Sequence, residues 1–435
     1  MVNVLVFPAG TEVGLEIERA LRHVRGINLI GATSACDHSA YTYERMAPHL
    51  PFFAAPDFIA KFEETSRCFE IEYVFPAHDD VIVTLSRWAA DRPEGQAPGI
   101  ISSGYATDIV ARSKRATYAA LCDVVATPEE YRPEDFLGTA DRPLFVKPDC
   151  GQGSKGTRKI ETGDPVGGIS RAELLLEFLP GDEYTVDCFT DRHGELRFAG
   201  ARQRVRTSNG ISVSTCGIED AALVEMARRI NAALRFRGMW FFQAKRRADG
   251  TPVLMEIATR VSGAMGYFRG KGANLPLLAL YDRMGKDLTV FTNEYGMVRD
   301  SALYPRYYVE LMFDTVYVDL DDTLIFQDKV NSDLMGLIYH WRNQGKRVHL
   351  ITRHRAVHGR APLHTLDSLC IAASLFTSII EVEPCAFKSS AITGKASIFI
   401  DDSTSERHDV HSKCAIPTFT CQQAVEVLSR SKGNF

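Results

Sequence analysis

The chain has 435 residues, of which 45% are hydrophobic and 24% charged, and its formal net charge is −5. This length predicts two to four domains, and the slightly acidic balance argues against nucleic acid or anionic membrane as a partner. The sequence shows no basic leader, no long apolar stretch and no CxxC pair among its ten cysteines, so we expect a cytoplasmic protein with free thiols.

Residues 2–32 have the pattern of a strand, a loop, a helix and a second strand. Apolar Val2–Phe7 and Ile27–Ala32 predict the strands, and the spacing of apolar residues over Leu15–Val24 predicts the helix. This order is typical of a βαβ unit in a parallel sheet. Its glycines do not fit the GxGxxG pattern, so they indicate a dinucleotide site only weakly.

A third strand, Tyr73–Pro76, is followed directly by His78 and Asp79. At the carboxyl end of a parallel strand these side chains either face a ligand or cap the next helix, and the sequence leaves both open. We therefore expect residues 1–105 to form a small parallel α/β domain.

Two lysines and a glycine-rich loop form the first candidate site. Lys114 lies on a predicted helix over 113–121, and Lys147 lies on a strand that ends at Pro148. The next segment, 149–157, holds three glycines, a serine and a lysine. The backbone N–H groups of such a loop can wrap a phosphate, although the loop is not a Walker P-loop. A mobile hairpin turn explains the same composition.

Further along, the sequence predicts a strand through Glu177, a Pro-Gly turn and a strand from Glu183. Two apolar segments then flank Asp-Gly, a dipeptide that strongly favours a hairpin. Gln243 lies on the first of these segments and Glu256 on the second. When the segments pair, both side chains can face one side, where their oxygens suit Mg²⁺.

Arginine alternates along Arg202, Arg204 and Arg206. On a strand this spacing puts three guanidinium groups on one face, and arginine suits bidentate binding of carboxylate or phosphate. A solvated basic strand is the alternative interpretation.

The most informative stretch runs from Val318 through Asp319 and Asp321 to Leu324. A buried strand that stops on Asp-x-Asp directs both acids to one point beyond the sheet edge. One carboxylate can attack phosphorus and the other can move the leaving-group proton, with Mg²⁺ lowering their repulsion. An Asp-rich turn at a strand end is the alternative.

Two further strands end in polar residues of the kind that such a site needs. The segment 348–352 ends at Thr352, and 398–400 is followed by Asp401 and Asp402. Lys388 lies between them, and Lys395 competes with it for the role of a lysine in the site. Between Leu324 and the strand that begins at residue 348, the chain is long enough for only one helix, predicted over 334–344. This leaves no room for an inserted cap domain.

Residues 1–310 together resemble the ATP-grasp superfamily, and within it the carbamoyl-phosphate-synthase-like carboxylate–amine ligases. The resemblance implies an N-terminal pre-ATP-grasp α/β domain (1–105) and an ATP-grasp α+β domain (106–312). It implies that ATP is bound by Lys114, Lys147, Gly151, Gly153, Ser154, Gly156, Glu177, Phe178, Leu179 and Glu183.

The same resemblance implies metal, catalytic and substrate positions. Gln243 and Glu256 are then Mg²⁺ ligands, Arg260 neutralises the transferred phosphate, and the substrate is bound by Arg202, Arg204, Ser262 and Gly263. One departure is that the family's hairpin usually reads Glu-x-Asn, whereas this chain has Ala258 in the third place. A ligand to a second metal is therefore missing or supplied from elsewhere.

The segment from Asp314 to Phe435 resembles the haloacid-dehalogenase-like (HAD) phosphatases, which implies a capless Rossmannoid domain (313–435) with an open site. The resemblance makes Asp319 the nucleophile and Asp321 the general acid and base, with Thr352 and Lys388 holding the phosphoryl group. The implied Mg²⁺ ligands are Asp319, Asp321, Asp401 and Asp402.

Together the resemblances imply an α/β enzyme with two activities. One is an ATP-dependent carboxylate–amine ligase that forms an acyl-phosphate and then an amide; the other is a Mg²⁺-dependent phosphomonoesterase in the same pathway. The expected partners are a small carboxylate, an amine and a phosphorylated metabolite, and a homodimer is an option. Two alternatives stay open: a non-ligating module that recognises ATP and substrate for the phosphatase, or a kinase opposed by its own phosphatase.

Overall fold

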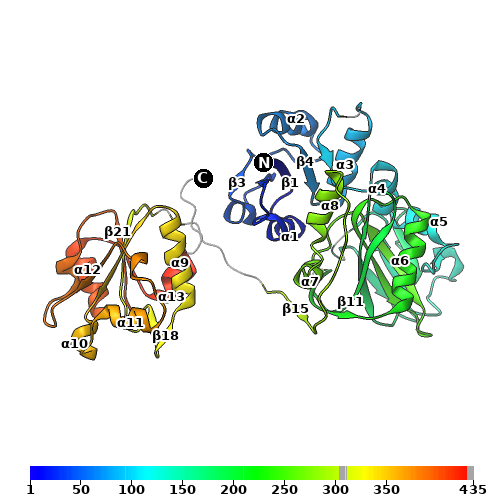
Figure 1. The fold of residues 1–435 in the computed structure, drawn as a ribbon. Coiled ribbons are helices and arrows are strands. Elements are labelled where there is room, and N and C mark those ends of the chain that lie inside the picture. Colours follow the sequence, from blue (N-terminus) through cyan, green and yellow to red (C-terminus); the bar gives the residue numbers. More distant parts are fainter. Residues whose placement is uncertain are drawn as a thin grey trace. The chain divides into compact units, whose positions relative to one another are not determined.

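The chain divides into two compact units, residues 1–303 and 304–435 (Figure 1). The computed structural model describes residues 1–93, 95–151, 153, 155–208, 210–302, 309 and 311–428. Among these residues, no helix has both the length and the apolar character needed to cross a membrane. The three-domain division stays a prediction.

The first unit opens with a five-stranded parallel sheet in the order β3-β2-β1-β4-β5. Its strands are β1 (Val2–Phe7), β2 (Ile27–Gly31), β3 (Arg45–Met46), β4 (Tyr73–Pro76) and β5 (Gly99–Ile100), and its helices are α1 (Glu12–Leu21), α2 (Phe58–Cys68) and α3 (Asp79–Ala90). Side chains of β1 alternate between two cores. Val4 and Val6 join the core that contains α1 and α8 (Leu275–Arg283), whereas Leu5 and Phe7 join the core that contains α2 and α3.

A four-stranded antiparallel sheet in the order β6-β9-β7-β8 follows. Its elements are α4 (Tyr105–Arg112), α5 (Lys114–Leu121), β6 (Glu130–Tyr131), β7 (Leu144–Pro148), β8 (Arg158–Ile160) and β9 (Glu173–Glu177). The glycine-rich loop connects β7 to β8, so it lies at the end of a hairpin. The chain leaves β9 at Glu177 and enters the next sheet at Glu183.

The largest sheet is antiparallel and has the order β14-β13-β10-β11-β12-β15. Its elements are β10 (Glu183–Thr190), β11 (Leu196–Ser208), β12 (Ile211–Ile218), α6 (Ala221–Ala233), β13 (Gly238–Arg246), β14 (Pro252–Ala258), α7 (Gly266–Gly270) and β15 (Val298–Asp300). Helix α6 covers one face, where Met226 and Ile230 pack into a core with Val186, Trp240 and Phe242 (Figure 1). The predicted hairpin around Asp-Gly is β13 and β14.

The second unit is built on a five-stranded parallel sheet in the order β20-β19-β16-β21-β22. The strands of this sheet are β16 (Thr315–Val318), β19 (Arg347–Thr352), β20 (Ser378–Glu381), β21 (Ser397–Ile400) and β22 (Thr418–Phe419). The unit also contains a separate antiparallel pair, β17 (Ile325–Phe326) and β18 (Lys329–Val330). Its helices are α9 (Ser332–Asn343), α10 (His354–His358), α11 (Pro362–Ser368), α12 (Thr404–Cys414) and α13 (Cys421–Leu428).

Helices cover both faces of this sheet (Figure 1). Val316 and Val318 of β16 pack in the core that contains α9 and α13, whereas Tyr317 packs in the core that contains α12. Strands β19, β16 and β21 are neighbours and parallel, so their carboxyl ends meet at one edge. Asp319, Thr352 and Asp401 lie at that edge.

Candidate active sites

Lys114 is the first residue of α5 and its side chain is almost buried beside the glycine-rich loop. Its ammonium group donates to the carbonyl oxygens of Asp149 at 3.3 Å and Gly151 at 3.2 Å. The carboxylate of Glu256 lies 3.8 Å away. Lys114 therefore connects the start of α5, the loop and the β13–β14 hairpin.

Lys147 on β7 is only 4% exposed, and its ammonium group donates to the carbonyl of Met255 at 3.1 Å. It forms no ion pair with any residue that the structure describes. Burial, together with the nearby charge of Lys114, lowers the pKa of Lys147 to about 7. An anion bound here would restore its full charge, because opposite charge favours the protonated form.

Both lysines line one cavity of about 120 Å³. The other described residues around it are Phe145, Pro148, Gly151, Gly153, Lys155, Thr157, Glu183, Arg204, Gly210, Gln243, Met255 and Glu256. Gly153 and Gly156 have φ angles of +66° and +74°, which a side chain would strain. Ser154 lies outside the described residues. A larger cavity of about 960 Å³ borders α6 and α7 and contains none of the predicted ATP-binding residues.

Gln243 and Glu256 are directly paired across the β13–β14 hairpin. Both line the cavity that Lys114 and Lys147 share, so their oxygens lie where a metal ion bound to phosphates would need ligands. Ala258 pairs with Phe241 and offers no side-chain ligand. These donors fit one Mg²⁺ ion, and the described hairpin supplies no counterpart of the family's asparagine.

The predicted adenine hinge follows β9. The carboxylate of Glu177 accepts hydrogen bonds from the Arg247 guanidinium, at 2.5 Å from Nη2, and from the backbone N–H of Glu129 at 3.0 Å. Phe178 is half-buried with the ammonium of Lys159 over its ring, and Leu179 is buried. Glu177 is thus held by protein partners, which orients the hinge backbone.

The three alternating arginines of β11 have different acidic partners. Arg202 is buried, with Nε at 2.7 Å from Asp187 and Nη2 at 2.8 Å from the hydroxyl of Ser262. Arg204 lies 2.7 Å from Glu183, and Arg206 pairs with Asp300. Nη1 of Arg202 is buried and has no hydrogen-bond partner within the described part of the chain. Gly263 directly follows Ser262 in the sequence.

Arg260, just after β14, makes two contacts with one carboxylate. Its Nε and Nη2 donate to Asp79 at 2.5 and 3.0 Å. Burial alone raises the pKa of Asp79, but Arg260 outweighs it and holds that pKa below its usual value. A phosphate at Arg260 would share this arginine with Asp79. His78 takes the capping role, because its Nδ1 accepts from the backbone N–H of Asp80 at 3.2 Å.

The centre of the second site is Lys388, the first residue of a short 3₁₀ segment (Lys388–Ala391). Its Nζ lies 2.5 Å from Asp319 and 2.7 Å from Asp401. All three side chains are buried. Burial and the charge of Asp401 raise the pKa of Asp319 against the opposing effect of Lys388, and the two carboxylates raise the pKa of Lys388. Lys395 is exposed, so of the two candidate lysines it is Lys388 that the structure brings to Asp319.

Carboxylate oxygens of Asp319, Asp401 and Asp402 lie within 4.8 Å of one another. Thr323 orients Asp402, because its hydroxyl accepts from the Asp402 N–H at 2.9 Å. Three convergent carboxylates fit a hard divalent cation such as Mg²⁺, which would relieve their mutual repulsion. The carboxylate of Asp321 belongs to a different group.

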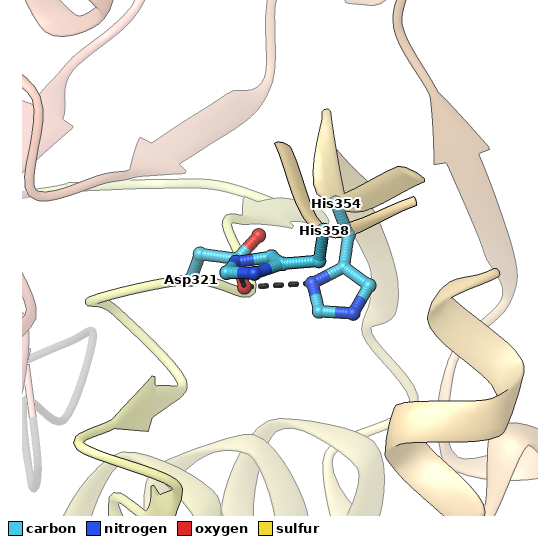
Figure 2. A group of neighbouring side chains, drawn as sticks. All are labelled: Asp321, His354 and His358. Carbon is cyan, nitrogen blue, oxygen red and sulfur yellow. Dashed lines mark hydrogen bonds and ion pairs between the residues drawn. The ribbon is translucent and has the colours of Figure 1, made fainter. Parts of the chain in front are cut away.

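Asp321 points to α10 rather than to the other three acids. Its Oδ1 lies 2.7 Å from Nδ1 of His354 and 3.4 Å from Nε2 of His358, and its Oδ2 accepts from the Thr352 hydroxyl at 3.4 Å (Figure 2). Sequence reasoning missed both histidines. The His-x-x-x-His spacing that begins two residues after Thr352 was the available signal, since it places two imidazoles on one helix face.

Sequence reasoning also missed groups that position the lysines of the first site. The hydroxyl of Ser113 donates to the Asp149 carboxylate at 2.9 Å, which also accepts from the N–H of Arg115. The ring of Tyr118 lies under Lys147, with its hydroxyl on the carbonyl of Met255 at 2.8 Å. Tertiary proximity alone reveals these roles, because the residues lie far apart in sequence.

Comparison with known proteins supports the first resemblance. A family model described as ATP-grasp in the biosynthetic pathway with Ter operon matches residues 170–299, less than half of the chain. No curated protein matches the sequence. A Campylobacter jejuni biotin carboxylase complexed with β-γ-ATP is 12% identical, with a TM-score of 0.52 over 66% of this chain and 72% of that one.

Two further structures are similar to a comparable extent. N5-carboxyaminoimidazole synthetase from Staphylococcus aureus, complexed with ADP, is 13% identical, with a TM-score of 0.54 over 67% of this chain and 78% of that one. N5-carboxyaminoimidazole ribonucleotide synthetase from Thermotoga maritima is 14% identical, with a TM-score of 0.54 over 72% and 83%. At identities this low the structural similarity shows a shared fold alone; together with the family-model match it confirms the predicted ATP-grasp fold. The HAD-like character of the second unit stays a prediction.

Proposed function

We propose that residues 1–303 form an ATP-dependent ligase that joins a carboxylate to an amine. The observation that carries this proposal is the convergence of Lys114, Lys147, Gln243 and Glu256 on one cavity within an ATP-grasp fold. Two lysines and two oxygen ligands are the groups that a metal-bound triphosphate requires. A buried lysine without an ion-pair partner in the described structure supports an anionic ligand in particular.

The first step of the proposed reaction transfers the γ-phosphoryl group of ATP to a carboxylate oxygen. The bond between the γ-phosphorus and its bridging oxygen breaks, ADP leaves, and an acyl-phosphate forms. Lys114 and Lys147 neutralise charge on the phosphate oxygens, and the backbone of the glycine-rich loop covers them. Mg²⁺ held by Gln243 and Glu256 would supply further charge neutralisation.

The second step joins the amine to the activated carboxylate. The amine nitrogen attacks the acyl carbon, phosphate leaves, and the nitrogen loses a proton to give an amide. We assign the carboxylate to the surroundings of Arg202 and Ser262, because Nη1 of Arg202 is a buried donor that a carboxylate would satisfy. Arg260, shared with Asp79, would neutralise the transferred phosphate.

Trapping of the acyl-phosphate tests this ligase. Hydroxylamine converts an acyl-phosphate to a hydroxamate, so we expect hydroxamate and ADP in equal amounts when the correct carboxylate is present. Lys147→Met should lose both products, whereas Lys286→Met, which removes an exposed lysine of the same unit, should keep them. Carboxylate-dependent hydroxamate formation that is equal in both variants would contradict the assigned site.

We further propose that residues 304–435 form a Mg²⁺-dependent phosphomonoesterase. This proposal is carried by Lys388, which lies between Asp319 and Asp401 at the carboxyl edge of a parallel sheet. Asp319 attacks phosphorus and the ester bond to the alcohol oxygen breaks, giving an aspartyl-phosphate. Asp321 donates its proton to the alcohol and then takes one from the attacking water, which releases phosphate and restores Asp319.

Mg²⁺ at Asp319, Asp401 and Asp402 would offset the negative charge that the phosphate brings. Thr352 and Lys388 bind the phosphoryl oxygens in this account. Hydrolysis of a panel of phosphomonoesters tests it: Asp319→Asn should lower the rate by on the order of 10³-fold or more. Asp314→Asn, which changes an exposed aspartate of the same unit, should keep the rate. Equal rates in the two variants would contradict the proposal.

Ala258 favours a second candidate function for the first unit. Without the family's asparagine, the unit could bind ATP and substrate and present the substrate to the phosphatase without ligating it. Saturable ATP binding with no ADP from any carboxylate–amine pair would favour this module. In the favoured account both activities serve one pathway, in which a phosphorylated building block is ligated and dephosphorylated.

A further inference from the structure

The group of Asp321, His354 and His358 combines one carboxylate with two imidazoles (Figure 2). One ligand atom from each of these residues lies within 4.8 Å of the other two. The proposed phosphatase uses Asp321 and neither histidine. Magnesium prefers oxygen ligands, whereas two imidazoles and a carboxylate suit zinc, iron and other divalent transition metals.

One of the three separations already matches a metal site, and a second is a hydrogen bond that would lengthen when a metal binds. Zinc–ligand bonds of 2.0–2.1 Å at tetrahedral angles put ligand atoms about 3.3 Å apart. Asp321 Oδ1 lies 2.7 Å from Nδ1 of His354 and 3.4 Å from Nε2 of His358. The side chain of His358 is 42% exposed, so it is free to turn toward the other two. The exposed side also leaves room for water as a further ligand.

His354 has the supporting contact that a metal-binding histidine requires. Its ring is buried, and Nε2 lies 2.6 Å from the hydroxyl of Thr365 on α11. That hydroxyl can accept a hydrogen bond from Nε2–H, and in this tautomer Nδ1 is unprotonated and able to bind a metal. When no metal is bound, the hydroxyl can instead donate to Nε2 while Nδ1–H donates to Asp321. Thr365 therefore satisfies both tautomers and fixes the ring in place.

The order of the elements explains why these residues meet. Strand β19 ends at Thr352, and α10 begins two residues later, with the N–H of His354 donating to the Thr352 hydroxyl at 3.0 Å. His354 and His358 are four residues apart, so one helical turn brings their rings together, with centroids 4.6 Å apart and planes tilted by 40°. Asp321 reaches them from the loop after β16.

We propose that Asp321, His354 and His358 form a binding site for one divalent transition-metal ion, separate from the Mg²⁺ site of Asp319, Asp401 and Asp402. A consequence, which rests on the proposed phosphatase, follows from the shared Asp321. A metal that engages its carboxylate prevents Asp321 from donating or accepting the proton. Occupancy of this site would then inhibit phosphoester hydrolysis.

Cobalt(II) titration of the full-length protein in excess Mg²⁺ tests the site without using activity. The d–d absorption of bound Co²⁺ in the visible region reports imidazole and carboxylate ligands. We expect one equivalent to bind to the wild type, and His358→Ala to weaken this binding by more than about tenfold. His358→Ala is suitable because the side chain is exposed.

Two control variants distinguish Co²⁺ binding at this site from binding at neighbouring residues. His364→Ala removes another exposed histidine of the same unit and should bind Co²⁺ like the wild type. Asp319→Asn should also keep the absorption band, so failure of the phosphatase proposal would leave this test valid. Equal Co²⁺ affinity in the wild type and His358→Ala, or no visible band in the wild type, would overturn the proposed site.

Zinc inhibition tests the consequence. In the wild type, Zn²⁺ should suppress phosphoester hydrolysis at a concentration at least about tenfold lower than in His358→Ala, each compared with its own rate without Zn²⁺. Loss of Co²⁺ binding in the variant with unchanged zinc sensitivity would retain the metal site and overturn its inhibitory role.

Discussion

Lys147 in the first unit and Lys388 in the second are equally buried, each 4% exposed, yet their pKa values shift in opposite directions. Burial and the nearby charge of Lys114 lower the pKa of Lys147 to about 7, and the Lys147 ammonium group donates to a backbone carbonyl. Lys388 contacts two carboxylates, which raise its pKa. Burial is the same in both cases, and the neighbouring charge decides the sign.

The comparison indicates what each site needs in order to function. The first site has a buried lysine, Lys147, that forms no ion pair with any described residue, so the site should gain an anion such as the triphosphate of ATP. In the second site, one lysine lies among three acidic residues. This site should therefore bind a cation before a phosphate can approach. The two proposed activities thus begin from opposite charge states.

Removal of each lysine charge should have opposite consequences for stability. Lys388→Met leaves Asp319 and Asp401 buried without their cation, and we expect the second unit to lose about 3–5 kcal/mol of its free energy of unfolding without added Mg²⁺. Lys147→Met removes a charge that is costly to bury, so at pH 7 we expect it to raise the free energy of unfolding of the first unit, by up to about 4 kcal/mol. Hydrogen exchange of β16 and β7 in the full chain measures both. Equal losses would contradict the comparison.

The ligand dependence of the same variants sharpens the contrast. Lys147→Met should weaken the ATP-dependent reaction by roughly 10²-fold or more, because a buried positive charge at the phosphates is lost. Lys388→Met should leave that reaction unchanged while abolishing hydrolysis of phosphomonoesters. Rates of ADP formation and of phosphate release in each variant measure this. A loss of ADP formation in Lys388→Met comparable to that in Lys147→Met would show that the sites are not independent.

Proton uptake should accompany ATP binding at the first site. With a pKa of about 7, Lys147 is mostly neutral at pH 8, and bound phosphate favours its charged form. We expect uptake of close to one proton at pH 8, with affinity falling as the pH rises above about 7. Calorimetry in two buffers with different ionisation enthalpies measures it, and Lys147→Met should abolish the uptake. The same uptake in the variant would refute the assignment.

Stability should change with pH for the same reason, and the sign follows from the lowered pKa of Lys147. Between pH 7 and its ordinary pKa of 10.5, the unfolded chain binds this proton more than the folded one. The contribution of Lys147 to stability therefore rises with pH across that interval, and its cost is complete below pH 7. The difference in free energy of unfolding between wild type and Lys147→Met, measured from pH 6 to 9, should narrow as the pH rises above 7; a difference that stays constant would contradict this.

The substitution Ala258→Asn has the smallest expected effect, and it acts on the rate of ADP formation. Ala258→Asn restores the side chain that the ATP-grasp resemblance expects after Glu256, and it should change ADP formation by less than about tenfold if one metal suffices. The dependence of the rate on Mg²⁺ concentration measures this. A much larger gain would indicate that the natural chain lacks a metal ligand and would favour the non-ligating module.

Much of the architecture was predictable because local patterns agree with it. Strands β1 and β16 are apolar on both faces, as a covered parallel sheet requires, and Asp-Gly marks the β13–β14 hairpin. Helix α1 begins at Glu12, earlier than predicted, because the Thr11 side chain accepts from the N–H of Gly14.

The candidate sites were less predictable, because their details depend on contacts across long stretches of sequence. The pairing of Arg260 with Asp79 joins residues 181 positions apart, and no local pattern indicates it. Asp321 illustrates the same limit: the Asp-x-Asp pattern suggested one shared metal site, whereas the fold turns its side chain toward His354 and His358. Strand order locates a site, and the packing of the next helix determines which atoms face each other.

The most direct test of two independent sites with two chemistries is ADP release by the Asp319→Asn protein. The variant is supplied with Mg²⁺-ATP and pools of small carboxylates and amines, and products are identified by mass. The account predicts ADP only with one carboxylate–amine pair, with one amide formed for each ADP. A phosphorylated hydroxyl compound in place of an amide, or bound ATP that never yields ADP with any pair, would contradict the proposed ligase.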